Sequence, residues 1–145
     1  MIFWLTGQPG SGKTTLAKWI YASILNKKVI VDGDDIREIF ENKDYSEQGR
    51  RKNVELAQNI ALFLHNKGVD VIVSVVSPYR DQRESFKERL KDNITELYIH
   101  CDDERGREKY HVLNYEPPID NFMDVDTTND DDFTSFQLIR EKLKI

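Results

Sequence analysis

The chain has 145 residues, of which 39% are hydrophobic and 32% charged, a composition that is ordinary for one folded domain in water. Its formal net charge of −5 argues against non-specific binding to nucleic acid as its main role. The single cysteine, Cys101, excludes an internal disulfide and a zinc cluster of several thiolates, and it suits a reducing compartment. No apolar stretch approaches the roughly 20 residues that span a bilayer, and the apolar N-terminus is too short for a secretory leader, so we expect a cytoplasmic protein.

The first predicted elements are a short buried strand at residues 2–5 and a helix at residues 16–20. Between them, residues 7–14 read Gly-Gln-Pro-Gly-Ser-Gly-Lys-Thr and match the P-loop pattern G-x-x-x-x-G-K-[ST]. Glycines let successive backbone N–H groups point at phosphate oxygens, and the start of the following helix adds favourable partial charge. Lys13 is expected to reach the β- and γ-phosphates, and the Thr14 hydroxyl to join the shell of a Mg²⁺ ion. The sequence therefore predicts a nucleoside triphosphate site formed by Gly7, Gly10, Ser11, Gly12, Lys13, Thr14 and Thr15.

A second short strand at residues 28–31 leads into Asp32-Gly33-Asp34, with Arg37 one helical turn later. Ligands of open α/β sheets bind at the carboxyl ends of the strands, so this segment is predicted to face the phosphates. Asp34 is the predicted catalytic residue, because a carboxylate there can accept a proton from an attacking hydroxyl or hold a water of the Mg²⁺ shell. Arg37 is predicted to grip a phosphate or sulfate of the acceptor, with a helix ion pair to Asp34 as the alternative. The alternative for Asp32 is a turn residue.

Ser46 is predicted to begin a long helix that Gly68 ends, and a continuous β-branched strand buried on both faces follows at residues 69–76. Ser77-Pro78-Tyr79-Arg80 comes directly after this strand. Core packing explains a proline and an arginine at such a strand end poorly, so a role in the site is predicted.

A charged helix is predicted at residues 80–91, and Arg83, Lys87, Arg89 and Lys91 are interpreted as its solvent-exposed side. Strands at residues 94–99 and 123–126 follow, and an amphipathic helix at residues 133–143 closes the chain behind an acidic start. This alternation predicts a single α/β domain over residues 1–145, a P-loop kinase fold with a parallel β-sheet covered by helices on both faces. Residues 102–121 show no clear periodicity, and a stretch of that length inside a domain is more often functional than slack.

Several of these segments together resemble an adenylylsulfate (APS) kinase. They are the P-loop, Val31-Asp32-Gly33-Asp34-Asp35-Ile36-Arg37, Tyr45-Ser46, Arg50-x-x-Asn53, residues 73–80, Tyr115-Glu116-Pro117-Pro118 and Val125-Asp126-Thr127. The match runs in order over most of the chain, and D-G-D-x-x-R together with S-P-Y-R is specific among P-loop kinases. The resemblance implies transfer of the γ-phosphoryl group of ATP, with Mg²⁺, to the 3′-hydroxyl of a small nucleotide.

By position, the resemblance implies that Lys13 and Asp34 are catalytic and that Thr14 and Asp34 serve the metal. It implies an acceptor site, with Tyr45 standing where the family usually has a phenylalanine that stacks on the acceptor base. The implied acceptor residues are Asp32, Arg37, Tyr45, Arg50, Asn53, Ser77, Pro78 and Arg80. The family also pairs into homodimers, for which no residue of the sequence demonstrates an interface.

The chain departs from the family in residues 102–121, which are expected to form a shortened lid. The K-G-L-Y-K-K-A and F-T-G-I segments are absent, and the second of these carries an aromatic residue that sandwiches the acceptor adenine. Arg105 is predicted to supply a charge over the ATP phosphates, Arg107 and Lys109 offer further charges, and Tyr110 offers a ring.

These departures keep other readings open. Arginines that usually follow the equivalent of Asn53 are replaced here by Val54-Glu55-Leu56, which favours a different acceptor such as the cytidine derivative cytidine diphosphoramidate. A polynucleotide end is a further alternative, against which the acidic charge weighs. A non-catalytic nucleotide switch is the alternative from another class, but the N-K-x-D motif that reads guanine is absent.

Overall fold

Residues 1–102 and 105–145 are described by the structure, a computed structural model; the part of the expected lid at residues 103–104 lies outside them. Five strands form one sheet in the order β2-β3-β1-β4-β5, and every neighbouring pair is parallel. The strands are β1 (Ile2–Thr6), β2 (Lys28–Asp32), β3 (Asp70–Ser74), β4 (Ile94–His100) and β5 (Met123–Asp126). The helices are α1 (Lys13–Ser23), α2 (Gly33–Ile39), α3 (Glu47–Asn66), α4 (Arg80–Leu90) and α5 (Asp132–Leu143), with short 3₁₀ turns η1 (Lys91–Asn93) and η2 (Glu108–Tyr110).

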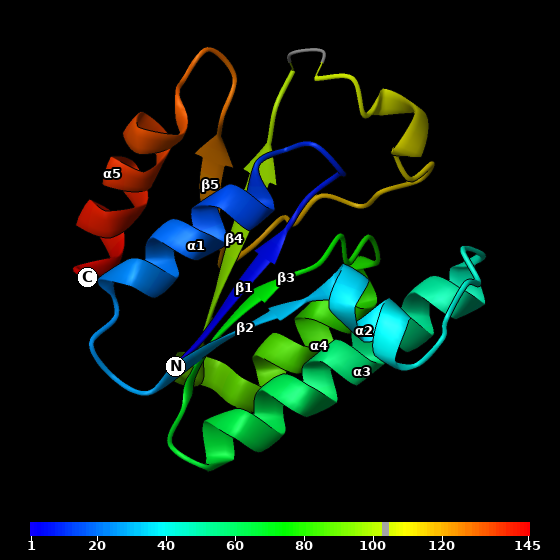
Figure 1. The fold of residues 1–145 in the computed structure, drawn as a ribbon, viewed down its shortest axis with the longest axis horizontal. Coiled ribbons are helices and arrows are strands. Elements are labelled where there is room, and N and C mark those ends of the chain that lie inside the picture. Colours follow the sequence, from blue (N-terminus) through cyan, green and yellow to red (C-terminus); the bar gives the residue numbers. More distant parts are fainter. Residues whose placement is uncertain (103–104) are drawn as a thin grey trace.

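Helices cover both faces of the sheet, as the sequence predicts. Helices α1 and α5 lie on one face, and α2, α3 and α4 lie on the other (Figure 1). Alternate residues of β1 enter different cores: Ile2 and Trp4 pack toward α3 and α4, whereas Phe3 and Leu5 pack toward α1 and α5. The central strands are therefore apolar on both faces, as parallel sheets require.

The helix starts agree with the predicted caps. Ser46 accepts a hydrogen bond from the backbone N–H of Gly49 and begins α3, and Asp32 accepts one from Asp34 and begins α2. Helix α3 ends at Asn66, just before Gly68, which has a left-handed φ of +79°. The strand expected over residues 69–76 is shorter, since ladder pairing covers only Asp70–Ser74.

The interpretation of Arg83 and Lys87 as solvent-exposed is wrong. Both are buried, and both form ion pairs with Glu96 of β4, whose own side chain is 2% exposed. Arg83 Nε donates to Glu96 Oε1 at 2.9 Å, Arg83 Nη1 donates to the main-chain oxygen of Ser77, and Nη2 donates to that of Glu116. Helix α4 thus holds the segment after β3 against the far end of the expected lid.

Within the described residues, no helix is long and apolar enough to cross a membrane.

Candidate active site

The P-loop curls between β1 and α1 because glycines occupy positions that a side chain cannot. Gly7 has a φ of +154°, and a Cβ there would lie 2.1 Å from the main-chain oxygen of Ile99. Gly12 precedes α1 with a left-handed φ of +103°. The loop therefore places the free N–H groups of the helix start at the carboxyl edge of the sheet, where anions bind.

Lys13 lies in the floor of the site and is 8% exposed. Its Nζ donates to the main-chain oxygen of Gln8 at 2.9 Å. Burial lowers the pKa of Lys13 from 10.5 to about 8; Asp32 and Asp34 oppose this effect, and Arg107 adds to it. The lysine is still mostly protonated at neutral pH, and a phosphate would supply the counter-charge that its burial removes.

One cavity of about 760 Å³ joins the P-loop to the predicted acceptor residues. Its walls come from the P-loop, the start of α2, the first half of α3, the segment after β3 and the lid. Of the predicted site residues, the cavity brings together Gly10, Lys13, Thr14, Asp32, Asp34, Arg37, Tyr45, Arg50, Asn53, Ser77 and Pro78. Residues separated by more than 60 positions in the chain therefore face one space.

The two aspartates at the start of α2 differ in environment. Asp32 is partly buried, and burial raises its pKa, while its carboxylate accepts the backbone N–H of Asp34. Asp34 is exposed at the cavity wall. Asp32 thus both caps the helix, in line with the turn alternative, and lines the cavity.

Oxygen donors at the cavity suit a magnesium ion. Thr14 and Asp34 both line the cavity and are exposed. Among residues 1–102 and 105–145, no cluster of three or more His, Cys, Asp or Glu side chains could hold a metal by itself. Mg²⁺ typically binds through one or two carboxylates together with substrate phosphates, so these residues fit that ion as part of a nucleotide complex.

Arg37 and Tyr45 form one wall of the cavity. The Arg37 guanidinium lies 4.0 Å from the centre of the Tyr45 ring, and its Nη1 donates to the main-chain oxygens of Asn42 and Asp44. An ion pair with Asp34, the alternative for Arg37, is not among those of the described part of the chain. The tyrosine ring is largely exposed, which leaves it available for stacking.

Two buried polar atoms of the cavity wall are without hydrogen-bond partners in the described part of the chain. Asn53 is 5% exposed; its Nδ2 donates to the main-chain oxygen of Gly33 at 3.4 Å, while its Oδ1 has no such partner. Ser77 has a φ of +48°, and its Oγ likewise lacks a partner. Buried polar atoms are normally hydrogen-bonded, so these two favour a polar ligand in the cavity.

Some predicted residues lie beside the cavity instead of lining it. Arg80 Nε and Nη2 both donate to the main-chain oxygen of Pro117, so its guanidinium anchors the end of the lid. Arg105 Nη2 donates to the main-chain oxygen of Thr127 and lies near Gly12. The remaining members of this set, Gly7, Ser11, Gly12 and Thr15, lie in the P-loop or at the start of α1.

The lid contributes residues to the cavity that the sequence singled out only loosely. Arg107, Lys109 and Tyr110 line it, together with His111 and Val112. Gln8 was missed altogether, because it stands at a position where the P-loop pattern allows any residue. Its side chain forms two hydrogen bonds with the main chain of Val112.

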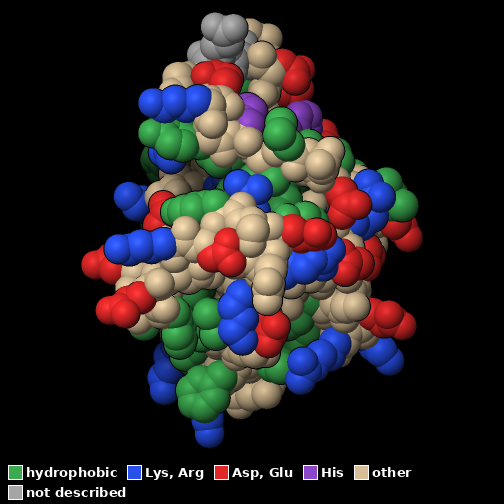
Figure 2. Space-filling model, turned by 90° about the vertical axis from the view of Figure 1, so that its right-hand side faces the viewer, with side chains coloured by type: hydrophobic (Ala, Val, Ile, Leu, Met, Phe, Trp, Pro, Cys, Tyr) green, Lys and Arg blue, Asp and Glu red, His purple; other side chains and the backbone are tan. Residues whose placement is uncertain are grey.

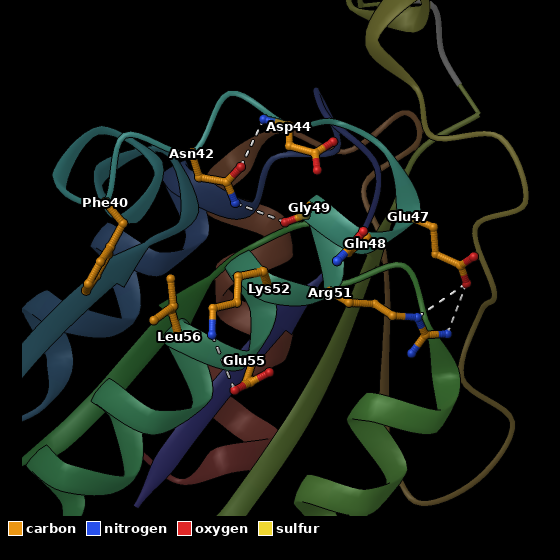
Figure 3. Close-up of a pocket in the computed structure, with 10 residues that line it drawn as sticks. All are labelled: Phe40, Asn42, Asp44, Glu47, Gln48, Gly49, Arg51, Lys52, Glu55 and Leu56. Atoms are coloured by element: carbon orange, nitrogen blue, oxygen red, sulfur yellow. Dashed lines mark hydrogen bonds and ion pairs between the residues drawn. The ribbon is translucent and has the colours of Figure 1, made fainter.

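A second depression of about 830 Å³ lies between the end of α2 and the start of α3, away from the P-loop (Figure 3). Its cationic side chains are already paired, Arg51 with Glu47 and Lys52 with Glu55. It contains no P-loop residue, so we place the chemistry in the first cavity.

A parallel sheet of this order, a P-loop and an acidic residue after the second strand define a P-loop kinase. The family model for adenylylsulphate kinase matches residues 1–116, and the chain belongs to that family. The family assignment confirms the resemblance derived from the sequence and identifies the chain as a phosphotransferase.

Relatives within the family differ in their acceptors. A cytidine diphosphoramidate kinase from Campylobacter jejuni is 34% identical over 132 residues, which cover 86% of this chain and 77% of that protein. An adenylyl-sulfate kinase from Bacillus velezensis is 33% identical over 107 residues, which cover 70% of this chain and 54% of that protein. The chain thus spans about half the length of the second relative.

A solved structure confirms the fold. The Mycobacterium tuberculosis APS kinase in complex with AMPPNP and APS superposes with a TM-score of 0.81, covering 99% of this chain and 97% of that one. Its sequence is 18% identical, so the likeness concerns the fold alone.

Proposed function

We propose that the chain transfers the γ-phosphoryl group of Mg·ATP to the 3′-hydroxyl of a small nucleotide. The observation that carries the proposal is the single cavity that joins the P-loop to Asp34, Arg37 and Asn53. A hydroxyl bound beside Asp34 faces a phosphoryl group bound at Lys13, which is the arrangement that in-line transfer requires.

Each residue has a distinct role in this proposal. Lys13 neutralises charge on the phosphoryl group in transfer, and Asp34 orients the attacking hydroxyl and accepts its proton. Thr14 and Asp34 would hold Mg²⁺, which would neutralise charge on the β- and γ-phosphates. Arg37 and Arg50 bind the charged groups of the acceptor, and Tyr45 stacks on its base.

Adenylylsulfate is the acceptor that the family suggests, and a cytidine diphosphate derivative is the second candidate. The match to the Campylobacter jejuni kinase, over 77% of that protein, supports the cytidine derivative. The short lid supports it as well, because a pyrimidine offers less surface to stack than adenine does and so depends less on a second aromatic residue. On these grounds we favour the cytidine derivative.

A polynucleotide acceptor is not supported. Figure 2 shows a face on which Lys and Arg side chains are interspersed with Asp and Glu side chains, and no extended basic area is seen among its described residues. Together with the net charge of −5, this disfavours a long phosphate backbone as ligand. The homodimer remains a prediction that light scattering would test.

A coupled ADP-release assay with Mg·ATP tests the function directly. Adenylylsulfate and cytidine diphosphate derivatives, including cytidine diphosphoramidate, are compared with a reaction that contains no acceptor. We expect turnover only with an acceptor, and faster turnover with the cytidine derivative. ADP release that no nucleotide accelerates would refute the kinase proposal, whereas preference for adenylylsulfate would refute only the choice of acceptor.

A further inference from the structure

Gln8 connects the P-loop to the lid. Its Nε2 donates to the main-chain oxygen of Val112 at 2.9 Å, and its Oε1 accepts the N–H of Val112 at 2.8 Å. The main-chain oxygen of Gln8 accepts the bond from Lys13 Nζ. One residue therefore contacts both the lid and the lysine that faces the phosphates.

The bridge fixes the part of the lid that covers the cavity. Val112 is 6% exposed, and the residues just before it, Arg107 and Lys109 among them, line the cavity. A Cβ on Gly10 would lie 3.1 Å from Cβ of Arg107, so the lid lies directly against the P-loop. Two antiparallel bonds to one residue fix its orientation as well as its distance.

We propose that Gln8 is a positioning residue that holds residues 107–112 over the bound phosphates and so keeps water from the γ-phosphorus. This inference rests on the proposed kinase function. When the lid is not held, a water oxygen forms the new bond to the γ-phosphorus and the bond to the β–γ bridging oxygen breaks. ADP and inorganic phosphate leave, and the proton of the water passes through Asp34 to solvent.

The substitution Gln8→Leu tests this role, because leucine has a similar size but can form neither bond. The matched control is Gln58→Leu, since Gln58 Nε2 also donates to a main-chain oxygen, that of Gln82, far from the cavity. ADP release is measured with and without acceptor, and the ratio of hydrolysis to transfer is compared. We expect Gln8→Leu to raise this ratio about tenfold, as expected for the loss of two partly buried hydrogen bonds, and Gln58→Leu to leave it unchanged.

A second measurement needs neither ATP nor acceptor. Limited trypsin digestion, followed by mass spectrometry, compares cleavage after Arg107 and Lys109 in the two variants. We expect faster cleavage at these two sites in Gln8→Leu alone; cleavage spread over the whole chain would reveal a variant that has not folded and would be replaced by Gln8→Met.

Equal cleavage rates and an unchanged ratio in a folded Gln8 variant would overturn the inference. A rise in the acceptor KM with no change in the ratio would also overturn it, because that result would indicate a role in acceptor binding. Failure of the kinase function is distinguishable, since the wild-type protein would then release ADP at the same rate with and without acceptor.

Discussion

Replacing Lys13 by methionine tests whether the buried ammonium group destabilises the free protein. Its pKa falls from 10.5 to about 8, chiefly through burial. At about 1.4 kcal/mol for each pKa unit, the protonated lysine costs the folded state roughly 3 kcal/mol. Methionine also removes the hydrogen bond to Gln8, which is worth about 1 kcal/mol. We therefore expect the free energy of unfolding at pH 7 to rise by about 2 kcal/mol.

The gain should depend on pH in a defined direction. Between about pH 8 and pH 10.5 the unfolded chain keeps a proton on Lys13 that the folded protein has lost, so wild-type stability rises with pH through this window. The methionine variant lacks this contribution. Its advantage should shrink above pH 8 and become a deficit of about 1 kcal/mol near pH 10.5, where only the lost hydrogen bond remains.

Urea unfolding at pH 7, 8.5 and 10 without nucleotide provides the measurement. The exposed Lys18 of α1 offers a matched control, since Lys18→Met should change stability by less than about 0.5 kcal/mol at every pH. A methionine variant at position 13 that is less stable than wild type at pH 7 would refute the reasoning. So would a stability difference that stays the same at all three pH values.

Three further substitutions test other parts of the site. Asp34→Asn should lower kcat by about 10²–10⁴ with little change in ATP affinity, as measured by steady-state kinetics and calorimetry; near-normal kcat would remove Asp34 from catalysis. Arg37→Ala should raise the KM of the acceptor roughly 10- to 100-fold and leave that of ATP unchanged, so equal losses for both substrates would contradict its placement. Glu96→Gln leaves Arg83 and Lys87 buried without a counter-charge and should cost about 3–5 kcal/mol in urea unfolding, a value that a loss below 1 kcal/mol would contradict.

The fold was predictable from sequence because its signals are local. Residues 69–76 are apolar without interruption, and Ser46 and Asp131 are good helix-capping residues in front of periodic segments. Each of these signals depends on neighbours within a few positions. The order of the strands and the pairing of β1 with both β3 and β4 depend on contacts between distant segments, and they follow from the general rules for such sheets and not from any residue.

The error at Arg83 and Lys87 has a physical cause. A helix rich in charge normally turns those charges to water, and the single acidic residue that buries them, Glu96, occupies a position in an alternating strand that reads as polar and outward-facing. Neither segment alone signals a buried ion pair. Only the packing of α4 against β4 brings the three charges together, so the sequence of either element predicts exposure.

The lid escapes prediction for a related reason. The bonds that fix it run from side chains elsewhere to its main chain: Gln8 bonds to Val112, and Arg80 bonds to Pro117. A main-chain donor or acceptor is present at every residue apart from the missing N–H of proline, so the receiving position needs no particular side chain. Family motifs therefore locate the P-loop and the acceptor residues, whose side chains carry the chemistry, but they say little about how a lid of different length lies over them. The choice of acceptor depends on that lid, which is why the acceptor assay decides a question that the motifs leave open.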